Sequence, residues 1–296
     1  MIDFLKRLFG RSTPSGPIPA SSRSAAAARA PRKPTIPDDE LDQFKRWYLA
    51  QNKPAVALLP DPDGPIGVVG SRLGGPAWLR EGEPWPVDRN GVPLEFLAQL
   101  DLADCRALEG YPHEGIVQFF IGRNDLHGAN FDDLLKGSYL VRHCQGDDRG
   151  ALHPPPPLEE QDGIAFSDYS PFCSEMVRNR GLALKAEPTD DPIDPAIKDA
   201  ERRILDLHDR YDLAPLDAFV EAHERPLRHH TGGHPAFTQS DIRLDASYAE
   251  YDRVLLRLTS DDNLMWGDSG EAVFMMRGAD LAAGDFDAVV YSWDCC

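Results

Sequence analysis

Residues 93–102 read PLEFLAQLDL, and residues 115–121 read GIVQFFI. Each is a short apolar run between turn-forming residues, which is typical of a buried β-strand. Because only a short stretch separates them, the two runs are expected to pair as an antiparallel hairpin. A second such pair occurs far downstream, where residues 253–259 read RVLLRLT and residues 270–276 read GEAVFMM.

The two pairs keep the same spacing to their flanking residues. Residues 75–97 and 233–255 each run from glycine to leucine over 22 positions, and residues 115–131 and 270–286 each run from glycine to phenylalanine over 16 positions. Agreement at both entry and exit predicts an internal repeat. Each unit is expected to be a glycine-cornered loop, a hairpin and a short helical turn that begins at Asp125 or Asp280.

A single hairpin is only marginally stable, so the two units are expected to form one sheet system related by a pseudo-two-fold axis. The sequence therefore predicts a strand-rich α+β fold with peripheral helices. Repeat A covers about residues 64–145, a helical connector about 146–225, and repeat B about 226–296. Apolar periodicity predicts helices from residue 38 to before Pro54, over 194–211 with Asp194 as N-cap, and over 216–223.

The first 37 residues differ from the rest of the chain. In residues 1–10, Ile2, Leu5 and Phe9 fall on one helical face beside Lys6 and Arg7, which predicts a short amphipathic basic segment that touches a membrane or a partner groove. The alternative is a frayed terminus. Residues 11–37 are rich in serine, alanine, proline and arginine and predict a disordered linker before a domain at 38–296.

The charge is divided unevenly. The 296-residue chain has a formal charge of −18, but residues 1–37 carry seven basic side chains against Asp3, so the remainder carries −24. An acidic body repels phosphate backbones, which argues against nucleic-acid binding by the folded part, and it attracts a basic protein or peptide. The alternative is that the acidity only maintains solubility.

The cysteines and the apolar content favour a cytoplasmic location. Five cysteines occur without CxxC spacing, no secretory signal opens the chain, and no apolar run is long enough to span a bilayer. The terminal Cys295-Cys296 pair lacks the basic stalk of a lipidated tail and is interpreted as incidental.

Several runs resemble one known family. These are LGGPAWL at 73–79, the two strand runs at 93–102 and 115–121, GGHPAFTQSD at 232–241, MWGDSG at 265–270 and DLAAGDF at 280–286. Together they resemble the YwqG-like family, a bacterial domain of unknown function, over about residues 38–296. The resemblance implies a cytoplasmic, strand-rich α+β fold and no particular reaction. The basic arm departs from the family pattern.

A histidine cluster has the residue types of a metal site. His229, His230 and His234 precede Asp241, and imidazole and carboxylate groups bind transition metals. In the other repeat, however, His230 corresponds to Arg72 and His229 to Ser71, which are not such ligands. We therefore predict no metal and no cofactor.

A group of carboxylates could support acid–base chemistry. Asp261, Asp262, Asp268 and Glu271 lie close in sequence, but residues 268–270 correspond to a turn at 113–115, so the structural interpretation is preferred. The sequence contains no GxSxG, Walker, GxGxxG or HExxH motif.

Aromatic and polar loop residues suggest a binding surface. Trp78, Trp85 and Trp266 lie in the glycine- and proline-cornered loops, alongside Arg72 and Gln239, and such side chains often anchor protein interfaces. The alternative is that the tryptophans fill the ends of the sheet.

We therefore expect a non-catalytic intracellular protein-binding module, of the immunity type that neutralises a basic toxin domain. The alternative is an enzyme with a small substrate in the cleft between the repeats, lined by Gln99, Asp241, Arg257 and Asp268. A purely structural scaffold is a third interpretation.

Overall fold

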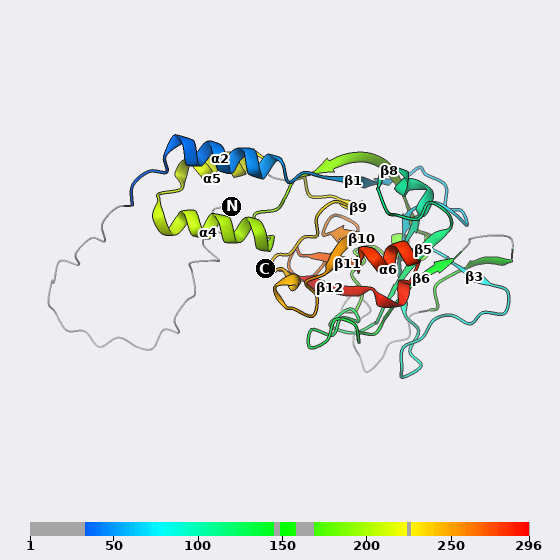
Figure 1. The fold of residues 1–296 in the computed structure, drawn as a ribbon. Helices are drawn as coiled ribbons and strands as arrows, with labels where there is room; N and C mark the ends of the chain where they lie inside the picture. Colours follow the sequence, from blue (N-terminus) through cyan, green and yellow to red (C-terminus); the bar gives the residue numbers. More distant parts are fainter. Residues whose placement is uncertain (1–32, 145–148, 158–168, 224–225, 296) are drawn as a thin grey trace, which may run out of the picture.

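The computed structural model describes residues 33–144, 149–157, 169–223 and 226–295. The predicted amphipathic segment at 1–10 and most of the predicted linker lie outside these residues. The described chain forms a strand-rich α+β fold, as predicted, with a large curved sheet and a helical cluster at one end (Figure 1).

Ten strands form the main sheet, in the order β12-β11-β10-β9-β1-β8-β2-β4-β5-β6. Their bounds are β1 Lys53–Asp61, β2 Arg72–Leu73, β4 Glu95–Asp101, β5 Ile116–Ile121, β6 Tyr139–Cys144, β8 Leu182–Asp191, β9 His229–Gly232, β10 Tyr251–Thr259, β11 Glu271–Arg277 and β12 Val290–Asp294.

The centre of the sheet is the antiparallel pair β1 and β8, which is in register from Lys53 opposite Asp191 to Asp61 opposite Ala183. Both predicted hairpins are present, because β4 pairs with β5 and β10 pairs with β11, each antiparallel. Outward from the centre, β2, β4, β5 and β6 follow on one side, and β9, β10, β11 and β12 follow on the other.

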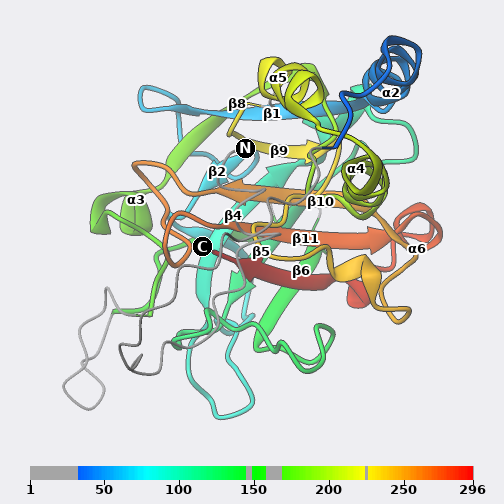
Figure 2. The same ribbon diagram turned by 90° about the vertical axis from the view of Figure 1, so that its left-hand side faces the viewer.

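The sheet curves so strongly that its two halves share one core (Figure 2). The rings of Phe119 on β5 and Phe274 on β11 lie 4.9 Å apart between centroids. At the terminal strands, the Tyr139 hydroxyl donates to the Val289 carbonyl at 2.7 Å. The apolar face of each half is therefore buried against that of the other.

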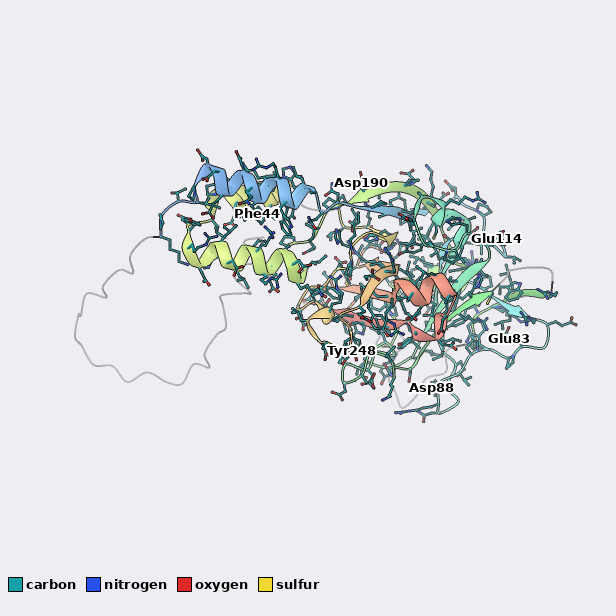
Figure 3. All side chains as sticks on the ribbon, viewed as in Figure 1. Phe44, Glu83, Asp88, Glu114, Asp190 and Tyr248 are labelled. Atoms are coloured by element: carbon teal, nitrogen blue, oxygen red, sulfur yellow. The ribbon has the colours of Figure 1, made fainter. Side chains whose placement is uncertain are left out.

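Three helices form a second core beyond one end of β1 and β8 (Figure 1). They are α2 Asp38–Leu49, α4 Lys198–Arg210 and α5 Ala214–Ala222. Helix α2 buries Leu41, Phe44 and Tyr48, the residues whose spacing predicts it. Figure 3 shows Phe44 within this cluster.

Two boundaries differ from the prediction. Helix α4 begins at Lys198 rather than near Asp194, because the Asp194 side chain accepts the Ala196 N–H at 2.7 Å and forms a turn instead. The folded body already includes residues 33–37, since Ile36 is buried in the helical core and Thr35 pairs with Asp212.

Short elements cover the rest of the sheet. The ribbon of β3 Ala77–Arg80 and β7 Gly150–His153 is a separate two-stranded sheet. The remaining helices are η1 Leu102–Ala107, α3 Glu175–Arg180, η3 Ile242–Leu244, α6 Gly278–Ala283 and η4 Phe286–Ala288. The helical turn predicted at Asp280 belongs to α6, which begins at Gly278, whereas Asp125 lies in a turn without a helix.

Candidate binding site

Arg72 and Gln99 lie directly opposite each other on β2 and β4. The Arg72 guanidinium donates to the carbonyls of Gly67 at 3.0 Å and Pro76 at 2.8 Å. Gln99 donates to the carbonyl of Val68, also at 3.0 Å. Burial lowers the pKa of Arg72 to about 10. Arg72 therefore fixes the loops on both sides of β2, and Gln99 fixes the loop before β2 to the sheet.

Trp78 lies on β3, and Trp85 lies in the loop that leads from β3 to β4. Trp78 is only 1% exposed, and its carbonyl accepts a hydrogen bond from Arg142 at 3.0 Å. Trp85 donates from Nε1 to the Leu94 carbonyl at 2.9 Å and meets the Phe120 ring edge-to-face. In this conformation Trp78 cannot contact a partner, which supports the interpretation that it fills the end of the sheet.

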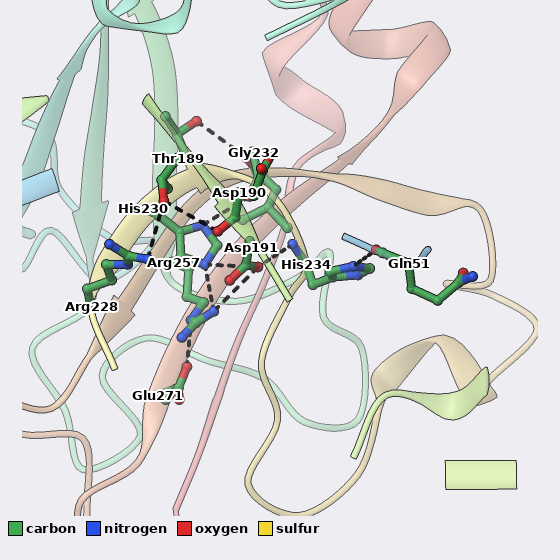
Figure 4. A network of polar contacts seen from close by, with 12 residues as sticks. Gln51, Thr189, Asp190, Asp191, Arg228, His230, Gly232, His234, Arg257 and Glu271 are labelled. Carbon is green, nitrogen blue, oxygen red and sulfur yellow. Dashed lines mark hydrogen bonds and ion pairs between the residues drawn. The ribbon is translucent and has the colours of Figure 1, made fainter. Parts of the chain in front are cut away.

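Arg257 lies at the centre of a polar network in the other half of the sheet (Figure 4). Its Nε is 2.7 Å from Glu271 Oε2, and its Nη1 is 3.9 Å from Asp191 Oδ2. Asp191 also accepts the His234 backbone N–H at 2.8 Å. Arg257 is fully buried, so these carboxylates compensate a charge that water cannot reach.

The three histidines bind protein groups. His230 Nδ1 lies 3.0 Å from the Gly232 carbonyl, which can only accept, so Nδ1 carries the proton and Nε2 accepts from Arg257 Nη1 at 2.6 Å. His234 Nε2 donates to the Gln51 carbonyl at 2.7 Å, and His229 Nδ1 accepts the Thr259 N–H at 3.2 Å. Among the described residues, no three potential ligands are grouped so as to hold a metal ion.

The predicted cleft residues lie at different places. Asp241 is buried and accepts hydrogen bonds from the Arg243 guanidinium at 2.9 and 2.6 Å, whereas Asp268 is exposed in a turn. Burial alone would raise the pKa of Asp241, but Arg243 and the Lys198 N–H lower it below its usual value. Gln99 and Arg257 belong to the separate clusters described above.

An apolar hollow of about 300 Å³ opens where loops of the two halves meet β12. We call it the Phe131 hollow; its lining residues are Phe131, Gln239, Ser240, Ile242, Ser292, Trp293, Asp294 and Cys295. Phe131 comes from the β5–β6 loop and meets the Trp293 ring at 6.0 Å. The buried Trp266, whose ring lies 6.3 Å from that of Trp293, packs behind it.

Asp294 shapes the rim of the Phe131 hollow. Its carboxylate accepts the backbone N–H groups of Thr238 at 2.9 Å and Gln239 at 2.7 Å, which fixes the β9–β10 loop against β12. Burial raises the pKa of Asp294, although these hydrogen bonds oppose the shift. The Gln239 side chain donates to the Cys295 carbonyl at 2.8 Å. The wall of the hollow is therefore held by the same residues that line it.

The surface around the hollow combines apolar and acidic side chains. Phe131 is 51% exposed, and Leu126, Leu135 and Leu244 on the same two loops are also exposed. Asp132 and Asp245, which follow the lining residues Phe131 and Ile242 closely in sequence, are exposed, and so is Asp268 in the turn after Trp266. An exposed aromatic side chain beside an apolar hollow is typical of a recognition site.

Two other hollows are weaker candidates for a binding site. One of about 580 Å³ is lined by the 86–89 loop and the 124–140 segment, but Asp88 and Asn124 use side-chain oxygens to accept N–H groups of their own turns. The other, of about 300 Å³, lies between α2 and α4, where Arg210 pairs with Glu40. Their polar groups stabilise local structure.

Of the residues predicted from sequence, Gln239 lines the Phe131 hollow and Trp266 supports it. Asp268 follows Gly267 in sequence, and a Cβ at Gly267 would contact the lining residue Cys295. The prediction did not include Phe131, Trp293 or Asp294. Phe131 ends the spacing that predicts repeat A, and Asp132 follows it; an aromatic residue beside charges in a loop is a signal that could have indicated exposure.

The described chain is a strand-rich α+β scaffold with an apolar hollow built from loops. Its sequence matches the domain of unknown function DUF1963 over residues 71–295, and the chain belongs to that family. A search of curated proteins finds no match. Among the described residues, no helix has the length and apolar character needed to cross a bilayer.

Proposed function

We propose that this protein is a non-catalytic protein-binding module and that its partner inserts an apolar side chain into the Phe131 hollow. The observation that carries the proposal is the half-exposed Phe131 ring beside Trp293 over an apolar hollow of about 300 Å³. Burying one apolar side chain there stabilises a complex by about 1.5–3 kcal/mol.

An internal duplication, with a pseudo-two-fold axis through the β1–β8 pair, explains why this hollow is distinctive. Under the repeat, Phe131 corresponds to Phe286, and the β12 residue Trp293 corresponds to the β6 residue His143. Phe286 lies 5.4 Å from the His143 ring, much as Phe131 lies 6.0 Å from Trp293. Phe286 is only 7% exposed, however, whereas Phe131 is 51% exposed. One copy of the contact is closed and the other is open.

The partner is a basic protein. The chain after residue 37 has a formal charge of −24, and the exposed Asp132 and Asp245 follow lining residues of the hollow closely in sequence, so a positively charged surface is attracted to this face. A basic toxin domain fits this description, and the protein would act as its immunity-type neutraliser in the cytoplasm. The narrower YwqG-like assignment is compatible with this role, since it implies no reaction.

The alternative, an enzyme acting between the repeats, has less support. Gln99 and Arg257 are buried and engaged by neighbouring groups, whereas Asp268 is exposed in a turn. Among the described residues, no pair of carboxylates lies at the rim of the Phe131 hollow in an arrangement that accounts for catalysis.

The test is affinity purification from the source cells with the full chain and with a Phe131→Asp variant. We expect one basic protein to be retained by the wild type and lost in the variant. Met176→Asp is the matched control, because Met176 is an exposed apolar residue on α3, 62% exposed. Equal recovery of the same partner by all three proteins would refute the proposed site.

A further inference from the structure

We propose that the basic N-terminal segment, residues 1–9, binds in the Phe131 hollow of its own chain and competes there with the partner. This inference rests on the proposed function, because it assigns a second occupant to the same site. Its basis is the chemistry of the segment, the charge around the hollow and the position at which the arm joins the body.

The segment has the chemistry that the hollow selects. Residues 1–9 read MIDFLKRLF, in which Leu5 supplies the apolar side chain for the hollow and the adjacent Lys6 and Arg7 supply positive charge. The hollow offers Phe131, Ile242 and Trp293 as apolar lining, and the exposed Asp132 and Asp245 follow two of these residues closely in sequence. Among the nearby basic side chains, Lys136 is paired with Asp133 at 2.8 Å and Arg243 with Asp241 at 2.6 Å, so they neutralise little of the remaining charge.

The arm joins the body at one end of α4, and the hollow lies near the other end. The Asp212 N–H donates to the Pro34 carbonyl at 2.8 Å, which places the first described residues at the C-terminal end of α4. At the other end of α4, the Lys198 N–H donates to Asp241 Oδ2 at 3.1 Å, directly before Ile242 of the hollow. In Figure 1, one end of α4 lies near the first described residues, and the other end lies near the C-terminus.

The length of the chain is sufficient for this contact. Helix α4 has 13 residues, and at 1.5 Å per residue it spans about 20 Å. The 23 residues from 10 to 32 can reach about 75 Å when extended, at about 3.3 Å per residue. The segment can therefore reach the hollow of its own chain, and the covalent connection gives it a high local concentration there.

Zero-length carbodiimide cross-linking of the purified full chain, read by mass spectrometry, tests this contact. We expect Lys6 to be joined mainly to Asp132, Asp245 or Asp268. In Leu5→Asp and in Phe131→Asp these cross-links should fall about tenfold, the change expected when one buried apolar side chain is lost. Ile18→Asp is the matched control in the arm, and Met176→Asp is the control in the body; both should retain the cross-links.

Mixed isotopically labelled and unlabelled chains separate binding within one chain from binding between copies. Cross-links within one chain support the inference, whereas cross-links between chains overturn it. Lys6 cross-links spread evenly over the acidic surface, or unchanged in Leu5→Asp, also overturn it. If these cross-links are absent and the full chain binds anionic vesicles through residues 1–9, the segment is assigned to a membrane instead. That result would likewise overturn the proposal.

Partner capture distinguishes this inference from the proposed function. If Leu5→Asp removes the cross-links and strengthens partner binding, both statements hold, because an internal competitor has been removed. If Leu5→Asp changes neither while Phe131→Asp still abolishes partner binding, the internal contact is refuted and the proposed function stands.

Discussion

Removing Glu271 should destabilise the protein strongly, because it leaves the fully buried Arg257 charge undercompensated. Glu271 Oε2 lies 2.7 Å from Arg257 Nε, whereas the next carboxylate, that of Asp191, is 3.9 Å from the guanidinium. We expect Glu271→Met, which keeps an unbranched side chain, to lower the free energy of unfolding by about 3 kcal/mol. For a domain of this size that corresponds to a fall in Tm of about 6–12 °C, measured by circular dichroism.

Two further variants test the physical reason. Glu187→Met removes the partner of Lys185 in an exposed ion pair and should change the free energy of unfolding by less than about 1 kcal/mol. The double variant Arg257→Met with Glu271→Met removes the closest pair but leaves Asp191, which keeps the His234 N–H, so it should regain only part of the loss. The reasoning is refuted if Glu271→Met is no more destabilising than Glu187→Met, or if the double variant is less stable than the single one.

Three other predictions follow from local geometry. Burial alone would raise the pKa of Asp261, but hydrogen bonds from His229 and from the Asn263 and Leu264 N–H groups hold that pKa well below its usual value. The contribution of Asp261 to the free energy of unfolding is therefore present above about pH 4 and is lost as the pH falls further. Asp261→Asn should flatten that part of a urea-unfolding series measured against pH, and an unchanged acid limb would contradict the assignment. Gly75 and Gly82 both have positive φ, but a Cβ at Gly75 would lie 2.8 Å from Gly181 Cα, whereas a Cβ at Gly82 would meet open space. Gly75→Ala should therefore lower the free energy of unfolding by at least about 1 kcal/mol more than Gly82→Ala does. Equal Tm values for the two variants would argue against that close contact. Burial raises the pKa of the Cys105 thiol to about 12. Iodoacetamide at pH 8 should therefore label the exposed Cys173 in the native protein and react with Cys105 only after unfolding. Labelling of Cys105 in the native protein would indicate a more open core.

The strands that form the two hairpins could be predicted because their signal is local. Residues 95–101 and 116–121 are nearly continuous apolar runs, and both are buried strands. Strand β8 covers Leu182–Asp191, but only its first half carries an apolar run. Its polar second half is not apolar enough to indicate a strand, and it is held there by pairing with β1, which lies more than a hundred residues earlier.

The candidate site could be predicted only in part, because it depends on contacts between distant segments. Gln239 and Trp266 were selected as loop residues, and both lie at the Phe131 hollow. Phe131 and Trp293 are 162 positions apart and meet only because the sheet curves its two ends together. Trp78 and Arg72 looked equally suited to binding from sequence but are buried, since loops cover that part of the sheet.

The central claim is that the Phe131 hollow binds a basic protein partner. The most direct measurement is isothermal titration of the purified partner into the full chain, the Phe131→Ala variant and the Met176→Ala control. We predict that Kd rises at least about tenfold for Phe131→Ala, since a loss of 1.4 kcal/mol has that effect, and stays unchanged for Met176→Ala. An unchanged Kd for a folded Phe131→Ala protein would contradict the claim.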